Sequence, residues 1–113
     1  MAIVLVKNTL SLADFQKACK DYQSYLKITI DIEQEAIALG GEYHADAEKI
    51  LLDNGSKQEN IWGGGVNLET GQYETTAMIN LRAGRNDSTD ILDLQARNKF
   101  LKLAQKTLQN YVR

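Results

Sequence analysis

The chain has 113 residues, of which 43% are hydrophobic and 25% charged, and its net charge is −2. Such a chain is expected to form a single globular domain over residues 1–113, and it lacks the broad basic face that binds duplex nucleic acid. No apolar run approaches the roughly 20 residues of a membrane span. The single cysteine, Cys19, excludes an internal disulfide and a thiolate metal cluster, so a reducing, cytoplasmic location is expected.

The first third of the chain predicts a strand, a helix and a second strand. Residues 2–6 form a short apolar, β-branched run that is typical of a strand. Ser11 has the properties of a helix N-cap, and the helix is expected to run to about Tyr25. Residues 27–33 alternate with isoleucines on one face, which indicates a half-buried strand. The alternation then slips, so we expect a bulge or a turn of helix at residues 34–36.

The middle of the chain predicts a helix and a β-hairpin. The helix should span residues 44–53, with acidic residues in its first turn and Gly55 as the glycine that follows its C-terminus. Residues 61–68 and 73–81 then read as two strands. Gly71 in the connecting turn can adopt the left-handed conformation that a bulged hairpin turn requires.

The last helix is expected to begin near residues 89–93 and to extend to about Val112. Its apolar stripe is wider than a surface helix needs, so it should clasp a sheet or help to form a dimer. The element order is therefore β-α-β-α-β-β-α, an α+β fold in which helices pack on a small mixed sheet. The strand–helix–strand start favours a right-handed parallel crossover.

Charge is distributed unevenly along the chain. Residues 28–59 contain eight acidic residues and two lysines, whereas residues 95–113 contain five basic residues and no acidic one. This asymmetry is compatible with head-to-tail association or with an anion site. The simpler interpretation, which we favour, is a solvated helix face whose cations suit the helix C-terminus.

His44, the only histidine, opens the predicted second helix. The segment at residues 44–48 is similar to the His-Ala-Glu opening of zinc deaminases, but the Pro-Cys-x-x-Cys that completes their metal site is missing. We therefore predict no metal site and no catalytic residue. Two interpretations remain for His44: it caps the helix or contacts a neighbouring loop, or it acts with Glu42 and Asp46 in a hydrolase.

A second group of unusual residues surrounds the predicted hairpin. Gly63, Gly64 and Gly65 match no nucleotide-binding fingerprint, so they indicate either close packing or a cradle of backbone amides for a phosphate. Trp62 offers a stacking surface, and arginine and asparagine side chains follow in the second strand and the next loop. The sequence thus predicts a site for a small anionic, nucleotide-like ligand. Its candidate residues are Trp62, Gly63, Gly64, Gly65, Asn80, Arg82, Arg85, Asn86, Thr89 and His44.

Three segments taken together resemble a small bacterial family of unknown function. They are GGEYHADAEKILL at residues 40–52, GSKQENIWG at residues 55–63 and MINLR at residues 78–82. The resemblance runs from about Tyr25 to the end of the chain and implies no particular activity. By analogy of size and class only, compact proteins of bacteria and their phages include oligomers that sequester cyclic nucleotide signals.

Three functional hypotheses follow from these patterns. The first is a non-enzymatic, homo-oligomeric binding protein, without a cofactor, that holds the anionic ligand described above. The second is a protein-interaction module that uses the basic C-terminal helix. The third is a hydrolase centred on His44 and neighbouring carboxylates.

Overall fold

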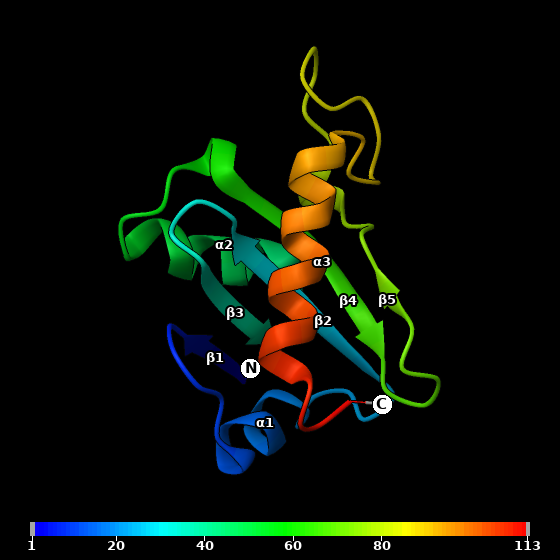
Figure 1. The fold of residues 1–113 in the computed structure, drawn as a ribbon. Coiled ribbons are helices and arrows are strands. Elements are labelled where there is room, and N and C mark those ends of the chain that lie inside the picture. The colour runs from blue at the N-terminus through cyan, green and yellow to red at the C-terminus, as the bar shows by residue number, and fades with distance from the viewer. Residues whose placement is uncertain (1, 113) are drawn as a thin grey trace.

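The computed structural model describes residues 2–112, which form three α-helices and one five-stranded sheet (Figure 1). The elements are β1 (Ile3–Val6), α1 (Leu12–Ala18), β2 (Tyr25–Asp31), β3 (Ala36–Gly40), α2 (His44–Asp53), the 3-10 helix η1 (Gln58–Asn60), β4 (Ile61–Asn67), β5 (Tyr73–Glu74), the 3-10 helix η2 (Met78–Asn80) and α3 (Leu94–Leu108). Within the described residues, no helix is both long enough and apolar enough to cross a membrane.

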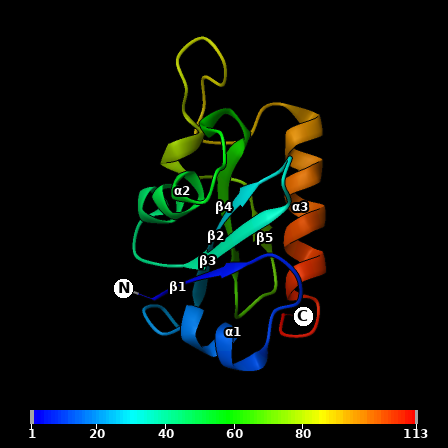
Figure 2. The ribbon, with the colours of Figure 1, turned by 90° about the vertical axis from the view of Figure 1, so that its left-hand side faces the viewer.

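The sheet separates two helical layers, with α2 on one face and α3 on the other (Figure 2). Because successive residues of a strand point to opposite faces, alternate residues of each strand join different cores. Ile28 and Ile30 of β2 belong to the larger core, together with Phe100 and Leu108 of α3. The smaller core lies beneath α2 and includes Leu51. The fold is therefore of the α+β class, as the sequence predicts.

Local signals locate several helix boundaries correctly. The Ser11 hydroxyl accepts a hydrogen bond from the Asp14 backbone N–H at 3.1 Å, so Ser11 is the predicted N-cap. The second helix spans His44–Asp53 as expected, and Gly55 after it has a φ of +96°. Gly71 also has a positive φ, +79°, in the turn between β4 and β5.

The sheet is antiparallel throughout, so the predicted mixed sheet with a parallel crossover is wrong. Its strand order is β1-β3-β2-β4-β5, and β3 pairs in antiparallel fashion with both β1 and β2. The cause is a hairpin where a bulge or a turn of helix was expected. The Asp31 carboxylate accepts hydrogen bonds from the backbone N–H groups of Glu33 and Gln34, which turns the chain back on itself. The resulting strand β3 inserts between β1 and β2.

Two predicted elements are shorter than expected. The first helix ends at Ala18, well before Tyr25. The second strand of the later hairpin comprises only Tyr73–Glu74, whereas residues 73–81 were predicted. Beyond Glu74 the chain still follows β4, but it contacts the strand through side chains instead of a backbone ladder.

Candidate functional site

The centre of the predicted ligand site lies along the outer edge of β4. There the Asn80 side chain takes the place of a neighbouring strand. The Gly63 N–H donates to Asn80 Oδ1 at 2.8 Å, and Asn80 Nδ2 donates to the Gly63 carbonyl at 2.9 Å. The same Nδ2 lies within hydrogen-bond distance of the carbonyls of Thr75 and Thr89. Asn80 is 0% exposed, so its amide group forms hydrogen bonds with the protein's own backbone and is not accessible to a ligand.

Asn86 holds the following loop in a similar way. Its Nδ2 lies 2.8–2.9 Å from the carbonyls of Asn80, Ser88 and Asp90. Its Oδ1 accepts a hydrogen bond from the Leu92 N–H at 3.0 Å. Buried polar groups that are satisfied to this extent make a loop rigid instead of leaving donors for a ligand.

The glycine run lets other elements approach β4 closely. A methyl group on Gly63 would lie 2.7 Å from the Ala77 side chain. A methyl group on Gly64 would overlap the Glu74 carbonyl oxygen and the ring of Phe100. The same change at Gly65 would overlap the hydroxyl of Tyr25. These contacts support close packing, one of the two interpretations of the run.

Trp62 and Arg82 meet at the start of β4. Trp62 is only 8% exposed, and the Arg82 guanidinium lies 4.4 Å from the centroid of its ring. Arg82 also donates to the backbone carbonyls of Glu59 and Ile61. Burial lowers the pKa of Arg82, but an arginine side chain stays protonated in proteins. The ring face that a nucleobase would use is therefore covered by the protein's own cation.

The remaining loop candidates lie further out. The Arg85 guanidinium is 3.7 Å from the Glu59 carboxylate, in an exposed ion pair. The Thr89 carbonyl accepts the N–H of Ala77 at 3.0 Å. The structure thus gathers Trp62 and its neighbours along β4, and the loop residues serve mainly to hold that edge.

His44 contacts the same edge from the first turn of α2. Its Nε2 lies 2.7 Å from the Gly64 carbonyl oxygen, which can only accept, so Nε2 carries the hydrogen. Burial lowers the pKa of His44 below its ordinary value of 6.5, opposed by the Gly64 hydrogen bond and reinforced by Lys27. The ring is therefore neutral near pH 7. Within residues 2–112, no cluster of three or more His, Cys, Asp or Glu side chains is placed to hold a metal ion.

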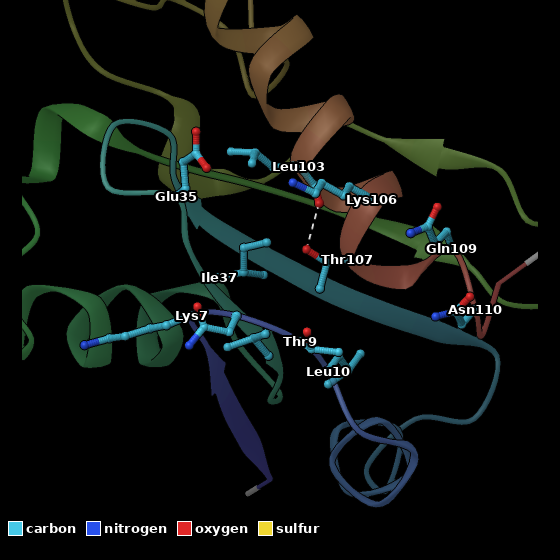
Figure 3. Close-up of a pocket in the computed structure, with 12 residues that line it drawn as sticks. Lys7, Thr9, Leu10, Glu35, Ile37, Leu103, Lys106, Thr107, Gln109 and Asn110 are labelled. Atoms are coloured by element: carbon cyan, nitrogen blue, oxygen red, sulfur yellow. Dashed lines mark hydrogen bonds between the residues drawn. The ribbon is translucent and has the colours of Figure 1, made fainter.

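An open region lies on the face of the sheet opposite α2, beside α3. A cavity of about 440 Å³ opens between the β1–α1 connection and the C-terminal half of α3 (Figure 3). A second hollow of about 410 Å³ lies between α3 and the β2–β3 turn. Glu35, Leu103 and Lys106 line both hollows, so we treat them as one feature, the α3 groove.

Lysines dominate the charge of the α3 groove. Lys99, Lys102 and Lys106 line the second hollow and recur at a spacing that places them on one side of the helix. Lys99 Nζ is 3.5 Å from the Glu33 carboxylate, whereas the other two have no ion pair among residues 2–112. Lys7 also lines the cavity, but Figure 3 shows its ammonium group extending away from the other residues drawn.

Polar but uncharged side chains complete the cavity. The Thr107 hydroxyl donates to the Leu103 carbonyl at 2.8 Å (Figure 3). Further hydroxyl and amide groups come from both ends of the cavity: Asn8, Thr9, Gln109 and Asn110. The basic C-terminal segment is evident from the sequence, but the groove is not. Its walls come from segments that are distant along the chain.

Fold and site together define a small α+β protein in which an antiparallel sheet lies between two helices and an open groove runs beside the longer helix. The chain matches the model of the family described as "Protein of unknown function (DUF5674)" over residues 4–107, and it belongs to this family. The match includes the first strand and helix, where the resemblance was not recognised from sequence. No curated protein and no solved structure matches the chain.

Proposed function

We propose that the protein is a non-enzymatic binding protein that holds a small anionic ligand in the α3 groove. The observation that carries this proposal is the convergence of Lys99, Lys102 and Lys106 on one hollow. Only two carboxylates, those of Glu33 and Glu35, face them there. The basic character of the C-terminal segment is thus concentrated beside an open space, where it can act on a ligand.

The size and lining of the groove favour a phosphate-bearing or carboxylate-bearing ligand. Each hollow lies within the range of roughly 300–1,000 Å³ that is usual for small-molecule sites. None of the residues that line the hollows is aromatic, so the groove offers no stacking surface for a base. Lysines bind phosphate as point charges, and the neighbouring hydroxyl and amide groups suit a sugar phosphate.

Titration calorimetry at low ionic strength tests the proposal. The probes are inorganic phosphate, pyrophosphate and a panel of nucleotides. We expect binding that weakens as salt is added, because the lysines are exposed and screened. A double variant, Lys102→Ala with Lys106→Ala, should weaken binding by about tenfold or more, or about 1.4 kcal/mol. The matched control is Lys49→Ala with Lys57→Ala, which removes two exposed lysines that line neither hollow.

A further variant distinguishes a ligand site in the groove from one at the β4 edge. Arg82→Ala should leave phosphate binding unchanged if the groove is the site. Loss of binding in Arg82→Ala but not in the double lysine variant would show that the ligand binds at the β4 edge and not in the groove. No detectable heat with any probe would overturn the proposal. The protein-interaction hypothesis would then gain support if Lys99→Glu with Lys102→Glu abolished capture of a cellular partner.

A further inference from the structure

The two edges of the sheet differ in how they are closed. At one edge, β5 is only two residues long, and the Asn80 and Arg82 side chains cover the rest of β4. At the other edge, β1 pairs with β3 alone. Within residues 2–112, no hydrogen bond joins the outer side of β1 to another segment. Figure 2 looks onto this edge, and no helix or strand crosses in front of β1.

Although β1 is short, it lacks three other features that usually block strand addition: residues 3–6 contain no charged side chain, no proline and no bulge. Natural edge strands are protected by charged side chains, proline, bulges or very short length. The four residues of β1 are Ile, Val, Leu and Val, and all pair regularly with β3. Ile3 and Leu5 are half-buried on the α2 face of the sheet, so they retain apolar surface that an added strand would cover.

Charged groups flank β1 in a self-complementary way. Lys7 follows the end of the strand, and Figure 3 shows its ammonium group directed away from the α3 groove. At the start of the strand, the Asp21 carboxylate accepts a hydrogen bond from the Ala2 N–H at 2.9 Å. When two copies of a strand pair in antiparallel fashion, the end of each lies beside the start of the other. Lys7 of each copy would then approach Asp21 of the other.

We infer that β1 is the interface for a second copy of this chain. The two β1 strands pair in antiparallel fashion about a two-fold axis perpendicular to the sheet, which gives a continuous ten-stranded sheet. Such an axis keeps both α2 helices on one face and both α3 helices on the other. Backbone hydrogen bonds between the two strands and burial of the remaining apolar surface of Ile3 and Leu5 stabilise the dimer. Two Lys7–Asp21 ion pairs determine the register of the strands. The α3 groove lies outside this interface, so the inference is independent of ligand binding.

Sedimentation velocity over a range of protein concentrations tests the inference. The wild-type protein should reach twice its chain mass of 12.7 kDa as concentration rises. Lys7→Glu alone, or Asp21→Lys alone, should raise the dimer dissociation constant about tenfold or more. An equimolar mixture of the two variants should dimerise again, because the mixed dimer contains one native Lys7–Asp21 pair and one pair between the two substituted residues, whose charges are reversed. Lys17→Glu, an exposed change on α1, should leave the dissociation constant unaltered.

Hydrogen exchange identifies the strand that pairs. Amides within residues 3–6 should become more protected as concentration rises, whereas those of β5 should not change. A protein that stays monomeric at all concentrations would overturn the inference. So would a dimer whose β1 amides exchange at the same rate at every concentration. Neither result depends on whether phosphate binds, so a failure here is distinct from a failure of the proposed function.

Discussion

The β4 edge and the α3 groove differ in what their polar groups do. The β4 edge comprises residues 62–65 and the Asn80, Arg82 and Asn86 side chains that hold them and the following loop. It contains the only tryptophan and a run of three glycines, and the ring of the only histidine, His44 of α2, contacts it. Asn80 and Asn86 are fully hydrogen-bonded there. The α3 groove is built from ordinary lysines, threonines and leucines, yet it encloses open space. Its ammonium groups include those of Lys102 and Lys106, which form no ion pair among residues 2–112. The unusual residues are used for close packing along β4, whereas the proposed binding site lies where segments distant along the chain meet.

The cost of burying polar groups explains this difference. A buried donor or acceptor that lacks a partner is expensive, so polar side chains inside a tight hairpin are selected to satisfy one another. A ligand site needs the opposite: groups held in place but left unsatisfied by the protein. Substitutions in the two regions should therefore have different effects, on folding at the β4 edge and on binding in the groove.

The largest effect is expected for Asn80→Ala. This change leaves the Gly63 N–H and carbonyl without partners in a buried position, removes the second amide N–H that the Thr75 and Thr89 carbonyls share, and opens a cavity. We expect a loss of about 4 kcal/mol in the free energy of unfolding. Urea denaturation followed by far-UV circular dichroism measures it. Asn98→Ala, on the exposed side of α3, is the matched control and should change stability by less than about 0.5 kcal/mol. A small loss in Asn80→Ala would remove the main evidence that this edge is scaffold.

Gly64→Ala should have the next largest effect. Its new methyl group would overlap the Glu74 carbonyl and lie 2.7 Å from the Phe100 ring, so the backbone of β4 or β5 must shift. We expect a loss of about 2–3 kcal/mol in the free energy of unfolding. Gly84→Ala is the comparison, because that site is open and only its φ of +77° opposes a side chain. Its cost should be about 1 kcal/mol. Equal costs at the two glycines would argue against a steric role for the run.

Glu35→Gly is expected to stabilise the protein slightly. Glu35 lines the α3 groove and is the one non-glycine residue with a positive φ, +57°, within residues 2–112. Glycine relieves that backbone strain but adds flexibility to the unfolded chain, so the net gain should be about 0.5–1 kcal/mol. Glu35→Gln keeps the strain and removes the charge. It should leave stability unchanged and strengthen phosphate binding, because the carboxylate opposes an anion in the groove. Weaker binding in Glu35→Gln would show that the carboxylate assists the ligand.

The sequence predicts those parts of the fold that local chemistry determines. Ser11 and Gly55 mark helix boundaries through caps that involve only neighbouring residues, so these boundaries are correct. The strand order is not local: β1 pairs with β3, about 35 residues away, and nothing within either strand specifies that partner. The turn after Asp31 was misread because its hydrogen bonds, not its hydrophobic pattern, reverse the chain.

The candidate site shows the same limit. Residues 73–81 alternate like a strand, and only the structure reveals that the Asn80 side chain replaces the backbone ladder. The lysines of the C-terminal helix were noted from sequence as a possible anion site. Their groove could not be predicted, because its opposite walls come from the β1–α1 connection and the β2–β3 turn. Those walls depend on tertiary packing, which sequence periodicity does not encode.

The smallest expected effect concerns His44, whose ring contacts the β4 edge through a hydrogen bond from only one of its two nitrogens, Nε2. Burial lowers its pKa in the folded protein below the ordinary value of 6.5. As pH falls through 6.5, the unfolded chain therefore binds a proton that folded His44 does not, and the free energy of unfolding decreases. Above that pH the imidazole is neutral in both the folded and the unfolded chain, so this proton penalty disappears.

Urea denaturation of the wild type and of His44→Gln at several pH values between 8 and 5 measures the contribution of His44 to the free energy of unfolding. Carboxylates contribute equally to both proteins, so the difference between the two curves reports on His44. We expect the variant to be less stable at pH 8, by about 1 kcal/mol for the lost hydrogen bond to Gly64. The difference in the free energy of unfolding between the two proteins should become smaller as the pH falls below 6.5, because only the wild type has a histidine whose protonation favours the unfolded chain. Parallel curves would mean that the imidazole titrates alike in the folded and unfolded states, and His44 would then belong with the accessible groups, not the scaffold.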